Sequence, residues 1–432
     1  MGVILIGFRN VFRNRRRSIL NIIALTIGIA IMIIGFGWVG GYNTYVFGAL
    51  IDFQTGHAQV LNEGYSAEAA RFPLDITVPD YAALQARLTE HPDIVEAAGR
   101  VNFSVEMSNQ RATIRLAGKA IEPAREARVT VIDEYIAEGS YLTEGRGVLI
   151  GRPIAERLDL AAGDVVFLTA TDKFGARNFV DARIVGVFDF GYPEIDENVL
   201  FMDMESAAGF LRLDNEVTRL AVRGTGGTDA SGLVREIEEI IATAGAATDH
   251  AETTTARSDG SSEDGVDLTV EEWQQFVRPA VVAVKSDTFF FWVMLVVLFI
   301  LIVVGIVNSM SMAILERTDE LGTLRAMGMR RRMLIRLVMA EGLCIAGIAT
   351  VAALVISTPV AVYLSTTGLD VSGALPEDVP VPFGEAFNAD FALLHYLVSI
   401  GVAAATAVVG SIIPAWRAAR MNIVTAMYGE RA

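Results

Sequence analysis

The sequence predicts an α-helical membrane protein with four transmembrane helices and a large mixed α+β extracytoplasmic domain between the first and second helices. Four apolar stretches are each longer than the roughly 20 residues that a helix needs to cross a bilayer. They cover about residues 18–50, 288–315, 333–363 and 391–416. The chain is 52% hydrophobic but has a net charge of −16, so its apolar and acidic residues must lie in different regions. The acids concentrate in residues 51–287, which hold 41 Asp and Glu against 21 Lys and Arg.

The spans divide the chain into three regions. Residues 1–50 form a basic N-terminus and the first helix, residues 51–287 form the extracytoplasmic core domain, and residues 288–432 hold the other three helices. The first span is much longer than the apolar core of a signal peptide, which has about 7–15 residues. We therefore interpret it as an uncleaved anchor.

Arginines mark one side of the membrane. They precede the first span, lie between the second and third, and follow the fourth. These arginines are Arg9, Arg13, Arg15, Arg16, Arg17, Arg317, Arg325, Arg330, Arg331, Arg332, Arg336, Arg417, Arg420 and Arg431. Because basic residues beside membrane spans stay in the cytoplasm, we expect both termini and the loop 316–332 to be cytoplasmic and the acidic domain to be outside.

The extracytoplasmic domain contains helix and strand patterns in alternation. Residues 81–91 have the apolar spacing of a helix, which His91-Pro92 would end. Alternating polar and apolar residues predict strands at 112–117, 165–170 and 178–190. Residues 148–168 predict a strand, a helix near 153–158 and a Gly163-Asp164 turn into another strand.

Two segments of this domain lack large apolar side chains. Residues 224–232 and 244–265 consist mainly of Gly, Ser, Thr, Ala, Asp and Glu. Such segments cannot bury enough surface to become ordered. We therefore expect mobile loops there, with a short helix at 233–242 between them.

The segment before the second span is expected to be helical. Within residues 268–285, the large side chains of Trp273, Phe276 and Val277 stand at helical spacing, and the segment leads straight into the span. Trp273 would be either an interfacial anchor or a core residue, and the sequence alone does not choose between them.

Small residues recur in the third and fourth spans. They are Gly342, Ala346, Gly347, Ala349 and Ala353, followed by Gly401, Ala405, Ala407 and Gly410. Small residues allow helices to approach closely in lipid, either within the chain or at a seam between subunits. The third span also contains Glu341, five residues from Arg336. We interpret it as part of a structural ion pair or as a snorkelling side chain rather than a functional carboxylate.

The sequence offers no pattern for catalysis or cofactor binding. There is no G-x-x-x-x-G-K-[ST] loop for nucleotide phosphates and no G-x-S-x-G elbow. The four histidines are scattered without zinc-site spacing. We therefore expect no catalytic, cofactor-binding or metal-binding residues and no enzymatic activity of the chain itself. The negative charge also argues against nucleic acid as a partner.

The most distinctive motif lies between the second and third spans. Residues 316–328, ERTDELGTLRAMG, predict a short amphipathic helix at the membrane surface. It is either an ordinary connector or a docking element. The motif resembles the E-R-x-x-E-[IL]-G-x-L-R-A-x-G coupling helix of the FtsX-like, MacB/Lol-type ABC transporter permeases. The resemblance implies that the site residues are Glu316, Arg317, Glu320, Leu321, Gly322, Leu324, Arg325 and Gly328.

Other segments carry the same resemblance. Residues 148–168 are similar to the family's extracytoplasmic core domain, and the ending Pro414-Ala415-Trp416-Arg417-Ala418-Ala419-Arg420 is similar to its C-terminal pattern. One departure is Asn422-Ile423, where the family usually has Asp-Pro. For the docking role, Leu321 and Leu324 would make the buried contacts, Glu320 and Arg325 would lie at the rim, and Gly328 would end the helix.

The resemblance implies a permease subunit in the bacterial cytoplasmic (inner) membrane. It would pair with a second permease, identical or different, and bind a cytoplasmic ABC ATPase dimer that carries ATP, so that no cofactor is expected in this chain. ATP-driven movement would pass through the helices to the external domain and move a lipoprotein or another amphiphile out of the membrane lipid. The motif at residues 56–60, GHAQV, favours lipoprotein release. The alternatives are a macrolide or peptide exporter and a signalling protein that activates a cell-wall hydrolase through a periplasmic contact.

Overall fold

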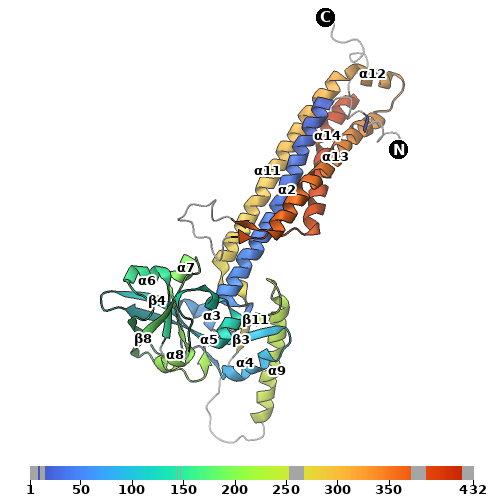
Figure 1. The fold of residues 1–432 in the computed structure, drawn as a ribbon. Coiled ribbons are helices and arrows are strands. Elements are labelled where there is room, and N and C mark those ends of the chain that lie inside the picture. Colours follow the sequence, from blue (N-terminus) through green and yellow to red (C-terminus); the bar gives the residue numbers. More distant parts are fainter. Residues whose placement is uncertain are drawn as a thin grey trace. The chain divides into compact units, whose positions relative to one another are not determined.

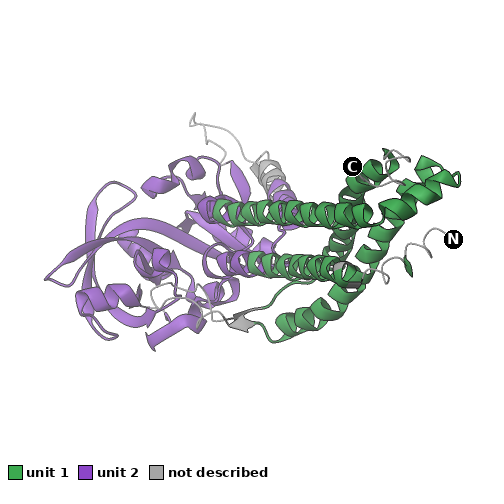
Figure 2. Cartoon of the chain, turned by 90° about the horizontal axis from the view of Figure 1, so that it is seen from above, with its two compact units in different colours: residues 1–43, 282–370, 386–432 green, residues 44–281, 371–385 purple. Residues whose placement is uncertain are grey.

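The computed structural model describes residues 8–9, 15–143, 145, 147–252, 267–370 and 386–420. The chain forms two compact units (Figure 2). We call residues 1–43, 282–370 and 386–432 the helical unit, and residues 44–281 with 371–385 the sheet unit. The long apolar helices are Ser18–Thr55, Arg278–Glu316, Arg331–Thr366 and Leu393–Arg420. They confirm the four predicted spans.

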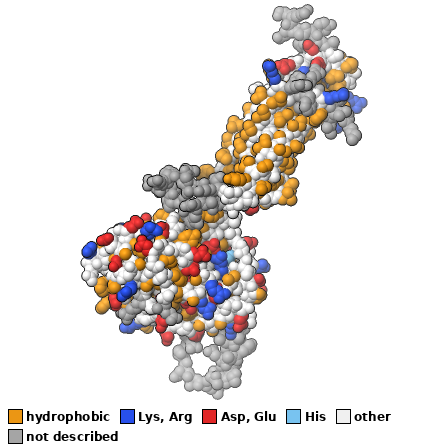
Figure 3. Space-filling model, in the orientation of Figure 1, with side chains coloured by type: hydrophobic (Ala, Val, Ile, Leu, Met, Phe, Trp, Pro, Cys, Tyr) orange, Lys and Arg blue, Asp and Glu red, His pale blue; other side chains and the backbone are white. Residues whose placement is uncertain are grey.

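Four helices pack together in the helical unit (Figure 1). They are α2 (Arg15–Leu50), α11 (Arg278–Glu316), α13 (Arg331–Thr366) and α14 (Leu393–Arg420), with the short α12 (Thr318–Ala326) between α11 and α13. All four long helices contribute to one apolar cluster. Large apolar side chains also cover the outside of this unit (Figure 3), as lipid contact requires. Residues 369–370 and 386–387 form a two-stranded ribbon, β13 (Leu369–Asp370) with β14 (Ala386–Phe387).

The small residues of α13 and α14 divide into two groups. Gly342 and Ala349 are buried, and a Cβ added at Gly342 would collide with the side chain of Ser411. Gly347 and Gly401, by contrast, are exposed and have no other part of the chain within 4 Å of an added Cβ. Packing within the chain therefore explains the first group only.

The sheet unit is built on a ten-stranded, largely antiparallel sheet. Its order is β12-β1-β11-β3-β4-β9-β6-β8-β5, and β7 pairs with β3 and β8. In chain order the strands are β1 (Ala58–Asn62), β3 (Ile94–Ser108), β4 (Thr113–Ile121), β5 (Ile136–Gly139), β6 (Gly147–Gly151), β7 (Val165–Thr171), β8 (Arg177–Phe188), β9 (Val199–Asp203), β11 (Arg219–Gly224) and β12 (Leu268–Glu272). β2 (Val78–Pro79) and β10 (Glu216–Val217) form a separate ribbon. The long β3 pairs with β11 near its start and with β7 near its end, so it joins the two halves of the sheet.

Helices, most of them short, cover this sheet. They are α3 (Tyr65–Glu68), α4 (Tyr81–Thr89), α5 (Pro123–Val129), α6 (Arg152–Leu158), α7 (Pro193–Asp196), α8 (Met204–Leu211), α9 (Ser231–Glu252) and α10 (Trp273–Phe276), with η1 (Ile51–Thr55), η2 (Ala69–Arg71) and η3 (Ile132–Tyr135). The predicted helix at 81–91 is α4, and the predicted strand–helix–turn–strand of 148–168 is β6, α6 and β7. Gly163 in that turn has φ +104°, a conformation that favours glycine.

Two predictions of secondary structure need correction. Residues 268–272 form β12 instead of a helix, because all five pair with β1, and Thr269 and Val270 are β-branched. Trp273 after it is only 1% exposed, so it is a core residue and not an interfacial anchor. α9 continues to Glu252, so residues 244–252 are helical and not a loop. That stretch is rich in alanine, the strongest helix former.

The other loop predictions fare differently. Residues 253–265 lie outside the described residues. Residues 225–230 form the predicted irregular segment between β11 and α9. Its backbone is bonded to two buried side chains, because Trp273 Nε1 donates to Thr228 O at 2.9 Å and His57 Nε2 lies 3.1 Å from Gly226 O. The mobility of this segment stays a prediction.

Candidate functional site

The candidate site is α12, which follows α11 directly. Arg317 is its N-cap, and the first turn contains Asp319 and Glu320. Carboxylates at this end stabilise a helix by interaction with its dipole, and Arg325 in the last turn does the same at the other end. The sequence therefore favours a separate short helix here rather than a continuation of α11.

Gly328 ends α12 as predicted. It has φ +95°, and its N–H donates to Arg325 O at 3.1 Å. The next N–H, that of Met329, donates to Leu324 O at 3.1 Å. These two bonds form a Schellman motif, in which glycine takes the left-handed position because a Cβ would be strained there. The chain then turns into α13 at Arg331.

The inner side of α12 is attached to its own chain. Arg317 Nη1 lies 3.5 Å from Glu341 Oε2 on α13, and the two side chains are 11% and 14% exposed. Arg325 Nη1 donates to Ala419 O near the end of α14 at 3.2 Å. Gly322 is buried. The ion-pair interpretation of Glu341 is confirmed, with Arg317 as a partner.

The apolar residues of the 316–328 motif, which include the predicted docking residues Leu321 and Leu324, do not share one face. Leu321 packs against the apolar cluster of the helical unit, Leu324 is partly buried, and Met327 is 72% exposed. A repeat of three residues falls about 60° short of a full helical turn at each step. These side chains therefore wind around α12, and Leu321 is directed at its own chain rather than outward.

An exposed stripe runs along the opposite side of α12. We define the outer face as Asp319, Glu320, Thr323 and Met327, all of which are exposed. Their spacing of three to four residues places them on one side of a helix. This face is acidic at one end, where Asp319 and Glu320 lie, and apolar at the other, where Met327 lies. Glu316, the last residue of α11, is also exposed.

His57 belongs to the 56–60 motif, which favoured lipoprotein release. In the structure its side chain holds the backbone of the sheet unit. It is buried in the sheet unit. Its Nε2 lies 3.1 Å from Gly226 O, and its Nδ1 accepts from the N–H of Gly224 at 3.3 Å. Burial lowers the pKa of His57 below its ordinary value. A neutral imidazole that holds the 224–226 backbone can account for this residue without any contact with a transported molecule.

Sequence reasoning missed one cluster of polar residues. His91, Asp93 and Glu236 each offer one ligand atom, and these atoms lie within 4.8 Å of one another. The H-P-D sequence at 91–93 was visible, but Glu236 is far away along the chain. Only the packing of α9 beside α4 brings it near.

Comparisons with known proteins cover both units. Residues 18–240 match the family model of the MacB-like periplasmic core domain, and residues 292–423 match that of the FtsX-like permease C-terminal region. The chain is 21% identical to a LolC lipoprotein-releasing system transmembrane protein of Xylella fastidiosa, with 98% of both chains covered. It is 24% identical to a LolE protein of the same kind from Haemophilus influenzae, over 39% of this chain and 42% of the relative.

A solved structure is also similar. The periplasmic region of MacB from Actinobacillus actinomycetemcomitans matches 53% of this chain and 94% of its own, with 10% identity and a TM-score of 0.36. At that TM-score it adds nothing to the assignment, which depends on the two family models.

Proposed function

The chain belongs to the FtsX-like permeases with a MacB-like periplasmic core domain, and from this premise we propose that it couples ATP hydrolysis on a separate ATPase to movement of its sheet unit. It is an ABC transporter permease of the MacB/Lol type. In this proposal the sheet unit is extracytoplasmic, and both termini and α12 are cytoplasmic. The arginines beside the spans support that orientation.

The observation that carries the proposal is the two-sided character of α12. Its inner side is linked to α13 through Glu341 and to α14 through Ala419 O. Its outer face exposes carboxylates and Met327. A partner that grips the outer face would therefore displace α13 and α14 together with α12. We assign docking to the outer face and transmission to the links made by Arg317 and Arg325.

The partner that fits this face is a cytoplasmic ATPase with a groove that is basic at one end and apolar at the other. Basic groups would pair with Asp319 and Glu320, and the apolar end would receive Met327. A second permease subunit would complete the complex, and the outward Gly347 and Gly401 are candidates for that seam.

The cargo we propose is a lipoprotein or another amphiphile in the outer leaflet of the membrane. Similarity to LolC and LolE proteins, which are named for lipoprotein release, supports this class. The outside of the described helices is apolar, and Glu341, the acidic residue within the third span, is paired with Arg317. We propose that movement of the sheet unit, rather than passage of the cargo between the helices, releases the cargo from the membrane.

Charge reversal on the outer face tests the docking assignment. The double variant Glu320→Lys, Met327→Asp should abolish co-purification with the ATPase and its stimulated ATP hydrolysis. A buried unpaired charge costs several kcal/mol, or more than about a hundredfold in affinity. Glu68→Lys, the same reversal at an exposed residue of the sheet unit, is the matched control. Normal assembly of the double variant would refute the assignment.

A second variant separates docking from transmission. Glu341→Gln removes the charge that holds Arg317 but leaves the outer face intact. We expect normal ATPase association with weakened coupling between ATP hydrolysis and cargo release. The cargo itself can be identified in the purified complex, where a bound lipid-modified protein supports release and a bound peptidoglycan hydrolase supports a signalling role.

A further inference from the structure

Three potential metal ligands meet on the sheet unit, in a place that the proposed function does not use. His91 follows α4, Asp93 precedes β3, and Glu236 lies in the first half of α9. One ligand atom from each lies within 4.8 Å of the others, and His91 Nδ1 is 3.8 Å from Glu236 Oε2. All three side chains are reachable from solvent, because Asp93 is exposed and the other two are 31% and 39% exposed.

The backbone around these ligands is well ordered by packing and hydrogen bonds. The neighbouring side chains of Ile94 and Ile237 are buried in one apolar cluster. The N–H of Ile94 donates to His91 O at 3.1 Å, and the N–H of Thr225 donates to Asp93 O at 2.9 Å. The ligands are therefore held on rigid elements, as a metal site requires.

The negative charge of Asp93 and Glu236 favours a bound cation. Two carboxylates stand close together, and like charges at such a distance repel each other. Within the described part of the chain, neither Asp93 nor Glu236 has an ion pair with lysine or arginine. The His91 imidazole lies beside them, and imidazole is an acceptor when neutral and a common metal ligand. Its Nδ1 accepts a long hydrogen bond from the N–H of Asp93 at 3.4 Å, which a metal ion at this nitrogen would replace.

We propose that His91, Asp93 and Glu236 bind a divalent transition-metal ion, with zinc as the best fit. One imidazole nitrogen and two carboxylate oxygens suit zinc, whereas calcium prefers oxygen ligands only. Bonds of about 2.0–2.2 Å place neighbouring ligand atoms about 3.4 Å apart, so rotation of the side chains is enough to close the site. Water completes the coordination. The ion ties α9 to the turn between α4 and β3.

Zinc titration of the full-length, tag-free protein in detergent tests this proposal. After EDTA treatment and its removal, ZnCl₂ is added in competition with a chromophoric chelator. We expect one equivalent of zinc to bind to the wild type, and affinity to fall at least tenfold in His91→Ala and in Glu236→Gln. Glu238→Gln, at an exposed residue two positions further along and therefore on the opposite side of α9, should bind as the wild type does. CaCl₂ should not compete.

Thermal unfolding keeps the test independent of folding defects. Without metal, the variants should unfold at the same temperature as the wild type, and zinc should raise that temperature for the wild type and Glu238→Gln only. Failure of the wild type to bind zinc, or undiminished binding by His91→Ala, would overturn the proposal. Neither outcome bears on ATPase docking, which depends on α12.

Discussion

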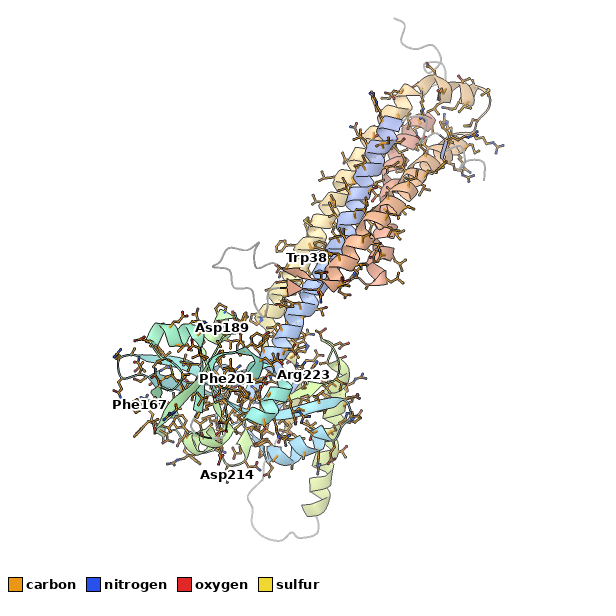
Figure 4. The ribbon with its side chains drawn as sticks, in the orientation of Figure 1. Trp38, Phe167, Asp189, Phe201, Asp214 and Arg223 are labelled. Atoms are coloured by element: carbon orange, nitrogen blue, oxygen red, sulfur yellow. The ribbon has the colours of Figure 1, made fainter. Side chains whose placement is uncertain are left out.

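The two units of this protein differ in the share of small side chains in their interiors. The core of the helical unit is rich in small side chains, such as the fully buried Ala349 and Ala353. The core of the sheet unit has more large ones, including the buried Phe103, Phe188 and Phe201, of which Figure 4 labels Phe201. Outside, the helical unit is covered with large apolar residues, while the sheet unit carries mixed charges (Figure 3).

This difference follows from the two solvents. Water drives large apolar side chains into the core of the sheet unit. Lipid gives no such drive, because lipid tails are as apolar as leucine, so close contact between small residues holds the helices together. Small residues therefore take a larger share of the core in the helical unit than in the sheet unit.

Buried charge also differs between the units. In the sheet unit Arg100 and Glu126 form a two-bond pair at 2.6 and 3.1 Å, and they are only 6% and 1% exposed. In the helical unit the Arg317–Glu341 contact is longer and more exposed. We infer that the first pair is a fixed part of the sheet unit and that the second is a weaker, more solvated link between α12 and α13.

The largest expected effect comes from breaking the fixed pair. Glu126→Gln leaves the Arg100 guanidinium buried without a carboxylate, which should destabilise the sheet unit by about 3–5 kcal/mol. Thermal unfolding in detergent measures this, with Trp273 fluorescence read in a background where Trp38, Trp292 and Trp416 are replaced by phenylalanine. Glu106→Gln, which affects the solvent-exposed contacts with Arg115 and Arg177, should lose little stability. An equal loss in both variants would contradict the distinction.

Lys119 gives a pH-dependent test of the same interior. Its ammonium lies over the Phe201 ring, 5.7 Å from the centroid, and burial, assisted by Arg100, lowers its pKa to about 8. The unfolded chain therefore holds this proton more tightly, and stability should rise as pH increases from 8 towards 10.5. Lys119→Met should remove that slope and stabilise the sheet unit near pH 7 by at most about 3 kcal/mol.

The control for this prediction is Lys285→Met, at an exposed lysine on α11. It should leave the pH dependence unchanged. The free energy of unfolding of the wild type and the two variants, measured at pH 7 and pH 10, tests this pH dependence. If Lys119→Met is less stable than the wild type at pH 7, the lysine makes a favourable contact that outweighs its burial.

The smallest effects are expected in the helical unit. Gly342→Ala forces a methyl group against Ser411 and should cost about 1–3 kcal/mol. Gly347→Ala, five residues further along on the exposed side of α13, meets no other part of the described chain within 4 Å and should be nearly neutral. Thermal unfolding of the two variants in detergent compares them. A large loss for Gly347→Ala in the assembled complex alone would show that the outward small residues contact another subunit.

The sequence by itself determined the features that depend on local patterns. Apolar length predicted the four spans, the Gly-Asp turn predicted the entry into β7, and Gly328 predicted the end of α12 through its tolerance of positive φ. The motif at 316–328 also identified the candidate site. These signals lie within a few residues of the structure they describe, so no distant contact is needed to interpret them.

Tertiary structure decided the features that depend on distant partners. Residues 268–272 form a strand because they pair with β1. Trp273, which follows this strand, is buried in an apolar cluster. Leu321 turned inward because the helical cluster lies on that side, and Glu341 found Arg317 across the turn from α12 to α13. Glu236 met His91 through the packing of α9. In each case the deciding contact joins residues far apart in sequence, and no local pattern records where the folded chain will bring such partners together.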